Sequence, residues 1–376
     1  MKKFVEANKE NLFELLKNMC HIPAPSHFED KRAEYCKKWF DENCLPGAFI
    51  DEAKNVIFPY NVTDSNPLLV LCAHTDTVFP DTEPMPYLDD GEYIHCPGVG
   101  DDTASLAILM HVAKYFAERK IETDVGVLFV ANSCEEGLGN LKGTREIFKK
   151  FGKRIKEFVS FDSAMNVIHE TVVGSVRYEV SVKTEGGHSY GKFGNKNAIA
   201  AISEMIGKIY SIKVPVVGNS KTTYNVGEIS GGTSVNTIAE SARMLCEYRS
   251  DNVDCLAIMK SYFEKIFEEA NTSESKVTVE IVGERPCASN TLDLSAQKAL
   301  ADKCEKVISR KVDKPVIRNS ASTDCNIPLS LGIPAVAVGV YYGSGAHTRA
   351  EKIEKASLPL GMELALELST MLTKGE

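Results

Sequence analysis

The chain has 376 residues, of which 43% are hydrophobic and 25% charged, a composition typical of a folded globular protein that excludes a disordered one. Its length exceeds the roughly 250–300 residues at which one hydrophobic core stops growing, so we expect two domains. The net charge of −9 argues against nucleic acid as a partner, because binding a phosphate backbone needs a basic face.

The N-terminal segment, residues 1–19, predicts an amphipathic helix, since charged residues interrupt its apolar stretch as they would not in a signal peptide. No apolar run reaches the ~18 residues of a membrane span, so we expect no membrane partner. The 11 cysteines are odd in number and include no C-x-x-C pair. That usage is typical of reduced thiols, and it predicts a cytoplasmic location.

Continuous apolar runs further along the chain predict strands that are covered on both faces, as in a parallel sheet flanked by helices. These runs occupy residues 67–73, 125–131, 158–161 and 333–342. Helical patterns occupy residues 103–120, 294–309 and 356–372. Strands that alternate with helices in this way indicate an α/β domain with a mostly parallel central sheet.

The middle of the chain follows a different pattern. From about residue 175 the predicted strands alternate between apolar and polar residues, which indicates a sheet with one exposed face. Strands are expected at 222–231, 242–250 and 276–283, and helices at 197–212 and 253–270. We therefore predict an inserted α+β domain at 175–285, within a discontinuous catalytic domain formed by 1–174 and 286–376.

Metal-binding and acidic side chains follow four of the buried strands. The residues at these strand ends, with two more at the start of the helix 103–120, are His74, Asp76, Glu135, Glu136, Asp162, His347, Asp101 and Asp102. Ligands of open α/β sheets bind outside the carboxyl ends of the strands. We therefore expect these side chains to share one edge of the sheet.

Two histidines and three or more carboxylates form the ligand set of a hydrolytic zinc site. If two ions bind, one carboxylate must bridge them, and Asp101 is placed between the other ligands in the chain. Of the adjacent pair Glu135 and Glu136, one could bind metal while the other acts as general base. Asp76 could accept a hydrogen bond from the second ring nitrogen of His74.

Each of these features has a structural alternative. Asp101 and Asp102 could cap the following helix, and Glu135-Glu136 could form a solvated turn. The coincidence of several such features at strand ends favours a functional site. His188, in the inserted domain, follows two glycines that would let a loop present its ring, and a functional and a structural role are both open for it.

The order of the motifs resembles that of a known family. These motifs are HTDTV (74–78), GVGDDTA (98–104), CEEGLGNLKG (134–143), the strand end at Asp162, GGHS (186–189), GGTSVNTIAE (231–240) and GSGAH (343–347). They resemble the co-catalytic di-zinc metallopeptidases that include peptidase T, glutamate carboxypeptidase, aminoacylase and succinyl-diaminopimelate desuccinylase. Peptidase T is the member that the chain is expected to be most like.

The resemblance implies a role for each residue. His74 and Asp162 would hold one zinc ion, Glu136 and His347 the other, and Asp101 would bridge them. Glu135 would be the general base and Asp76 would orient His74. The inserted domain would be a lid and dimerisation domain, in which His188 stabilises the oxyanion and Asn236 and Arg249 contact substrate. The guanidinium of Arg249 suits a free carboxylate, although a surface arginine at a strand end is the alternative.

These expectations define a cytosolic exopeptidase or dipeptidase that hydrolyses small peptides with a water bridging two zinc ions. Cobalt or manganese could replace zinc, and the enzyme would be a homodimer. The first alternative is an N-acyl-amino-acid amidohydrolase, which would use the same chemistry. An alternative of another class is a non-catalytic ligand-binding relative. The sequence does not separate peptide from N-acyl amino acid substrates.

Overall fold

The computed structural model describes residues 1–43 and 45–374. Two compact units are present: a first unit of Met1–Val172 with Thr291–Glu376, and a second unit of Val173–Asn290. The predicted roles of the second unit as a lid and dimerisation domain stay predictions.

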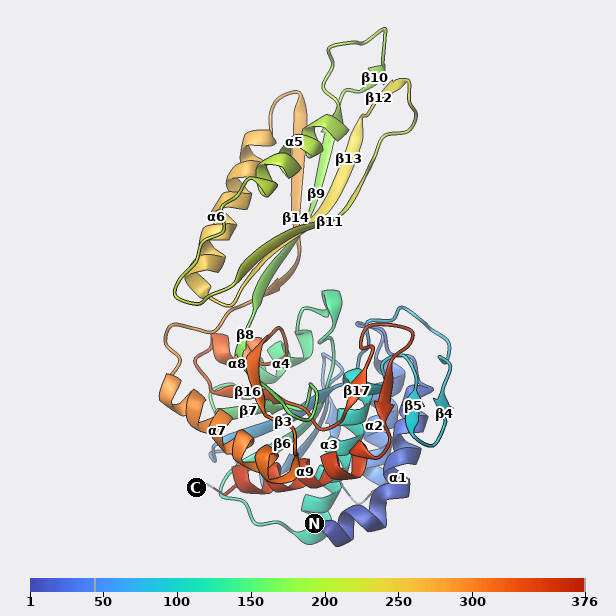
Figure 1. Cartoon of the computed structure of the whole chain (residues 1–376), viewed down its shortest axis with the longest axis vertical. Helices are drawn as coiled ribbons and strands as arrows, with labels where there is room; N and C mark the ends of the chain where they lie inside the picture. The colour runs from blue at the N-terminus through green and yellow to red at the C-terminus, as the bar shows by residue number, and fades with distance from the viewer. Residues whose placement is uncertain (44, 375–376) are drawn as a thin grey trace. The chain divides into compact units, whose positions relative to one another are not determined.

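The first unit is built on a mostly parallel sheet with strand order β1-β2-β6-β3-β7-β16-β8-β15 (Figure 1). In that order the strands are Phe49–Ile50, Val56–Tyr60, Gly126–Asn132, Leu68–His74, Ile155–Ser160, Ala335–Val338, Val167–Val172 and Ile317–Ala321. The central strands β6, β3, β7 and β16 pair in parallel. Their carboxyl ends therefore meet at one edge, as the apolar runs predicted.

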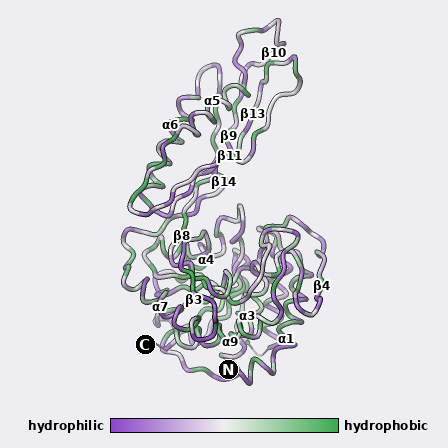
Figure 2. Tube along the Cα trace, in the orientation of Figure 1, coloured by the Kyte–Doolittle hydropathy of each residue, from purple (hydrophilic) through white to green (hydrophobic). Residues whose placement is uncertain are grey.

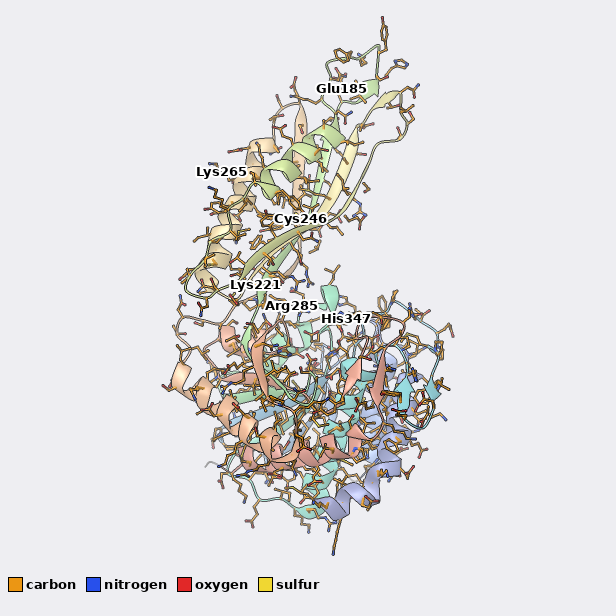
Figure 3. All side chains as sticks on the ribbon, viewed as in Figure 1. Glu185, Lys221, Cys246, Lys265, Arg285 and His347 are labelled. Atoms are coloured by element: carbon orange, nitrogen blue, oxygen red, sulfur yellow. The ribbon has the colours of Figure 1, made fainter. Side chains whose placement is uncertain are left out.

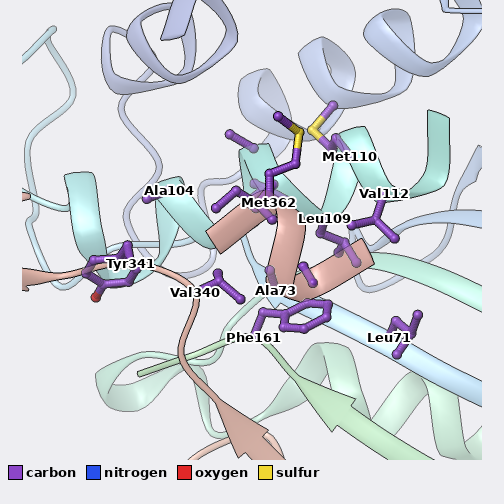
Figure 4. Close-up of a cluster of buried hydrophobic side chains, with 14 of the residues drawn as sticks. Leu71, Ala73, Ala104, Leu109, Met110, Val112, Phe161, Val340, Tyr341 and Met362 are labelled. Carbon is purple, nitrogen blue, oxygen red and sulfur yellow. The ribbon is translucent and has the colours of Figure 1, made fainter. Parts of the chain in front are cut away.

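Helices flank both faces of this sheet. They are α1 (Lys2–Cys20), α2 (Asp30–Glu42), α3 (Ser105–Arg119), α4 (Lys142–Phe151), α7 (Leu294–Lys311), α8 (Asn326–Ser330) and α9 (Ser357–Leu372), with short turns η1 (Val99–Ala104) and η2 (Gly137–Gly139). Figure 4 shows Leu71 and Ala73 of β3 within the cluster that also contains Met362 of α9. On the other face Phe158 of β7 packs against Phe148 of α4, with ring centroids 5.9 Å apart.

A small sheet of short strands completes the first unit. Its order is β17-β18-β5-β4, formed by Gly343–Ser344, Lys352–Glu354, Tyr93–His95 and Leu88–Asp89. The antiparallel pairing of β18 with β5 aligns Ile353 with Ile94. This ladder joins the segment that follows His347 to the segment that precedes Asp101.

The second unit has an antiparallel sheet, β11-β13-β9-β14, with two helices on one face. These elements are Thr222–Gly231, Ser241–Ser250, Gly174–Thr184, Ser275–Arg285, α5 (Ala198–Tyr210) and α6 (Val253–Ala270); a separate pair is β10 (Gly187–His188) with β12 (Thr237–Ile238). Green and purple residues alternate along α6 in Figure 2, as expected of a helix with one buried face. In Figure 3, Cys246 marks the buried side of this unit and Lys265 its solvated side.

The described elements agree with the predicted α/β class and with each predicted helix and strand, within a few residues at the ends. No helix in the described part of the chain is both long and apolar enough to cross a membrane. The cysteines that the structure describes are buried free thiols.

Candidate active site

The carboxyl ends of the central strands bring five predicted ligands together. His74 is the last residue of β3, Asp162 follows β7, and Glu136 follows β6. Asp101 lies within η1, and His347 lies in the loop between β17 and β18, where Figure 3 labels it. The cluster is thus collected from segments that are far apart in the sequence.

Asp101 occupies the middle of the cluster. Its Oδ1 lies 3.0 Å from Nε2 of His74, and its Oδ2 lies 2.9 Å from Nε2 of His347. Two groups of possible ligands share this carboxylate: His74, Asp101 and Asp162, and Asp101, Glu136 and His347. Within each group the ligand atoms lie within 4.8 Å of one another. Asp101 is therefore placed where one carboxylate could serve two ions.

The charge balance of the cluster favours a cation. Burial, together with the nearby Asp101, raises the pKa of Asp162 well above its ordinary value. Burial also raises the pKa of Glu136 to about 7. Among the described residues, no side chain donates a hydrogen bond to the Asp162 carboxylate. Carboxylates and imidazoles crowded in this way fit divalent metal ions such as zinc or manganese.

The carboxylates of the cluster raise the pKa of both histidines. Hydrogen bonds to Asp101 and Glu136 raise the pKa of His347 to about 10. Burial opposes a charge on His74, but contacts with Asp101 and Asp76 outweigh it and leave its pKa well above the ordinary value. The surrounding carboxylates thus favour the charged form of both rings when no metal ion is bound.

Asp76 is fully buried and contacts His74, one of the residues of the cluster. Its carboxylate accepts hydrogen bonds from the backbone N–H groups of Glu135 and Glu136, both at 2.9 Å, and from Ser26 Oγ at 2.6 Å. The ring of His74 makes its hydrogen bond to the backbone oxygen of Asp76, at 3.0 Å, while the Asp76 carboxylate lies 3.5 Å from the same nitrogen. The principal contacts of this carboxylate therefore fix the loop that carries the two glutamates.

The segment that carries Asp101 is held by Glu351, which the sequence analysis did not single out. The Glu351 carboxylate is buried and accepts hydrogen bonds from the backbone N–H groups of Gly98 (2.6 Å), Gly100 (2.8 Å) and Asp101 (2.9 Å). A β-carbon on Gly100 would lie 2.8 Å from the Tyr341 ring, so only glycine fits there. The carboxylate of Asp102 accepts from the backbone N–H of His74, which ties this segment to β3.

Asp324 is a second buried carboxylate that sequence reasoning missed. It accepts a hydrogen bond from Nδ2 of Asn132, at the end of β6, and another from Oγ1 of Thr144 in α4. Burial raises its pKa to about 7. No spacing in the sequence relates Asp324 to Asn132, so only the fold reveals this contact.

The remaining predicted site residues lie in the second unit. His188 is exposed, and its Nδ1 accepts hydrogen bonds from the backbone N–H groups of Tyr190 and Gly191, both at 3.3 Å. The side-chain oxygen of Asn236 accepts from Ser234 Oγ. Arg249 donates to Glu247 through Nε at 2.8 Å and Nη2 at 3.1 Å. These three residues are outside the ligand cluster, and their proposed roles toward it stay predictions.

Comparisons with known proteins place this cluster in context. Residues 70–370 match a family model described as "Peptidase family M20/M25/M40". Succinyl-diaminopimelate desuccinylase of Corynebacterium glutamicum is 24% identical over 356 residues, which are 90% of each chain.

Two solved structures share the fold over nearly their whole length. A tripeptidase of Staphylococcus aureus has a TM-score of 0.78 at 22% identity, covering 97% of this chain and 99% of that one. A dinuclear metal-binding peptidase of the M20 family from Bacillus subtilis has a TM-score of 0.68 at 14% identity, covering 98% and 99%.

Proposed function

Because the chain belongs to peptidase family M20/M25/M40, and is therefore a hydrolase, we propose that it cleaves amide bonds in small peptides as an exopeptidase or dipeptidase. The resemblance found in the sequence is thereby confirmed at the level of the family. The observation that carries the proposal is the position of Asp101, with one oxygen facing His74 and the other facing His347.

The donors fit two divalent ions, for which we propose zinc, with cobalt or manganese as replacements. His74 and Asp162 would hold one ion, Glu136 and His347 the other, and Asp101 would contact both. When bound, the ions would polarise the scissile carbonyl and lower the pKa of the attacking water.

Glu135 is proposed as the general base. The residue is 5% exposed and its backbone N–H donates to Asp76, and a carboxylate oxygen of Glu135 lies within 4.8 Å of possible ligand atoms of His74 and Glu136. Glu135 takes a proton from the attacking water and returns it to the leaving amine. Asp76 is proposed to act through the loop that carries Glu135 and through its contact with His74, since its hydrogen bonds go to both.

The local geometry of His188 supports its proposed role at the oxyanion. Because Nδ1 accepts two backbone N–H groups, the proton of the neutral ring is carried by Nε2. An exposed Nε2–H can donate to a developing negative charge. Glu247 holds Nε and Nη2 of Arg249, which leaves Nη1 of Arg249 to face a substrate carboxylate, and Asn236 is proposed to contact the same substrate.

A homodimer formed through the second unit and a cytoplasmic location complete the proposal. Tyr190, Phe193 and Val235 of this unit are large apolar side chains that are at least 90% exposed. Large apolar side chains left exposed in this way support an interaction surface on this unit. Light scattering of the purified protein would measure the oligomeric state.

The runner-up is an N-acyl-amino-acid amidohydrolase, which the similarity to succinyl-diaminopimelate desuccinylase supports. A substrate panel separates the two functions. The protein, loaded with Zn²⁺, Co²⁺ or Mn²⁺, is assayed against di- and tripeptides, N-acetyl amino acids and N-succinyl amino acids.

Cleavage of peptides well above that of the acylated amino acids supports the peptidase, and the reverse order selects the amidohydrolase. The Glu135→Gln variant, purified in parallel, controls for contaminating peptidases. Binding of peptides without turnover in every metal-loaded form would contradict both functions.

A further inference from the structure

Arg32 of α2 is a buried cation outside the ligand cluster, with only 1% of its surface exposed. Its guanidinium makes five hydrogen bonds. The acceptors are the backbone oxygens of Met19 (2.9 Å), Ile22 (3.1 Å from Nε and 2.6 Å from Nη2) and Thr75 (2.8 Å), and Oγ1 of Thr103 (3.3 Å). Every acceptor is uncharged. In the part of the chain that the structure describes, no carboxylate is among the hydrogen-bond partners of Arg32.

Two of these bonds, both made by Nη1, reach the two segments that carry proposed metal ligands. Thr75 lies between His74 and Asp76 at the end of β3. Thr103 lies two residues after Asp101, and its hydroxyl also donates to the backbone oxygen of Gly98 at 2.6 Å. One guanidinium nitrogen therefore joins the end of β3 to the turn η1.

A packing role does not explain this residue. Removing a charge from water costs several kcal/mol, and a buried apolar side chain of similar size would fill the space without that cost. The planar guanidinium, however, holds several oxygen atoms at fixed angles, which an ammonium or a methyl group cannot do. The arrangement of acceptors matches this property, because they come from α1, the end of β3 and η1.

We propose that Arg32 is a positioning residue, which fixes the His74 segment relative to the Asp101 segment and so prepares the cluster for its metal ions. The inference rests on the proposed function, since it assumes that the cluster binds metal. It concerns a residue that lies outside residues 70–370, the part of the chain that matches the family.

The test measures cobalt binding and the visible absorption of the cobalt-loaded protein, which reports the ligand geometry directly. The variants are Arg32→Met, Arg32→Lys and Thr103→Val; the last removes the hydroxyl at nearly constant size. We expect Arg32→Met to weaken cobalt binding by roughly 10- to 100-fold and to alter the spectrum. Arg32→Lys keeps the charge but loses the planar guanidinium, so its cobalt affinity and spectrum should lie between those of Arg32→Met and the wild type. Thr103→Val should shift both readouts in the same direction as Arg32→Met.

Arg154→Met is the matched control. Arg154 also donates to backbone oxygen, reaching Asn66 O from Nε at 3.2 Å and from Nη2 at 3.1 Å, but at the opposite end of β3 from His74. This variant should lower thermal stability while it leaves the cobalt affinity and spectrum unchanged. If Arg154→Met changed the cobalt affinity and spectrum as much as Arg32→Met does, Arg32 would act only through general stability. That result would overturn the inference.

A folded Arg32→Met variant whose cobalt affinity and spectrum match those of the wild type would also overturn the inference. If Arg32→Met does not fold, wild-type cobalt affinity and spectrum in both Arg32→Lys and Thr103→Val would overturn the inference. Absence of cobalt binding by the wild-type protein would instead reject the proposed function, and the positioning role with it.

Discussion

Asp101 is the residue on which the proposed chemistry depends most. Burial disfavours its charge, but hydrogen bonds to His347 and His74 hold the pKa of this carboxyl well below its ordinary range. It therefore stays ionised and divides its two oxygens between two histidines. In the proposed loaded cluster both oxygens of Asp101 would face metal ions, so we assign the role of general base to another residue.

The Glu135→Gln variant tests whether Glu135 is the general base. The amide cannot accept a proton, so we expect kcat to fall roughly 10²–10⁴-fold while both metal ions stay bound. Turnover on the best substrate of the panel and metal content by mass spectrometry provide the two readouts. Glu122→Gln, at an exposed position, is the control and should match wild type. Near-normal turnover in Glu135→Gln would assign the base elsewhere.

Metal binding should depend on pH. At pH 7 the unloaded protein holds a proton on His347, whose pKa is about 10, and part of one on Glu136, whose pKa is about 7. Metal ions bind the deprotonated groups, so binding releases protons and tightens as pH rises, by about tenfold per pH unit for each proton released.

Calorimetry with Mn²⁺ in buffers of different ionisation enthalpy counts these protons. We expect at least one per protein at pH 7. His95→Gln alters a histidine that pairs with Asp90 outside the cluster, and it should leave the count unchanged. An affinity that is constant from pH 6 to pH 8 would contradict the prediction.

The sequence was sufficient to propose His74, Asp162 and Glu136 because parallel strands bring their carboxyl ends to one edge of the sheet. It was not sufficient for Arg32, Glu351 or Asp324. Those side chains act through backbone or neutral groups in distant segments, and such contacts leave no spacing to recognise.

At the scale of elements, the turn η1 depends on hydrogen-bond partners supplied by other segments. The Glu351 carboxylate accepts hydrogen bonds from the backbone N–H groups of Gly100 and Asp101 in η1 and of Gly98 just before it. Arg32 donates a hydrogen bond to the hydroxyl of Thr103. Glu351 follows His347 by four residues, so one short loop supplies a proposed ligand and also anchors the segment of another. The strand pair β18–β5 continues the same connection.

Glu351→Ala would leave three buried N–H groups without an acceptor. We expect the free energy of unfolding of the unloaded protein to fall by at least about 2 kcal/mol, since each unpaired group costs roughly 1–3 kcal/mol. Glu351→Gln keeps one oxygen and should lose less. Urea denaturation measures both, with Glu354→Gln, an exposed glutamate of β18, as the control. Equal stability of Glu351→Ala and Glu354→Gln would show that these hydrogen bonds contribute nothing.

Long apolar or alternating segments predicted their elements well, as β3 and β9 illustrate. The short strands β4, β5, β17 and β18 were not predicted, because two or three residues show no periodicity. Strands β8 and β15 were also missed. Their polar residues, such as His169 and Asn319, pair with each other across the ladder and conceal the usual apolar pattern.

At the scale of the whole molecule, the first and last strands of the second unit's four-stranded sheet, β9 and β14, are neighbours in that sheet. Ser175 of β9 pairs with Arg285 of β14, so the two ends of the insertion lie about 5 Å apart. Each unit has its own hydrophobic cluster. The first unit alone contains the ligand cluster.

Replacement of residues 175–285 by a short glycine–serine linker tests this division. We expect the shortened protein to fold and to bind metal with an affinity close to that of wild type. Turnover should fall roughly 10²–10³-fold or more, because the proposed oxyanion donor His188 is removed with the second unit. Circular dichroism, cobalt titration and the peptide assay provide the readouts. Full turnover would show that His188, Asn236 and Arg249 are dispensable.

The ligands extend from His74 to His347, with the second unit between them in the chain. During synthesis, the ribosome makes four of the five proposed ligands before it reaches the second unit and the last only after it. A nascent polypeptide thus lacks one of the proposed ligands until the whole second unit has been synthesised. On the proposed assignment, the full set of metal ligands is present only after the second unit has been made, so the cluster cannot bind both ions before then.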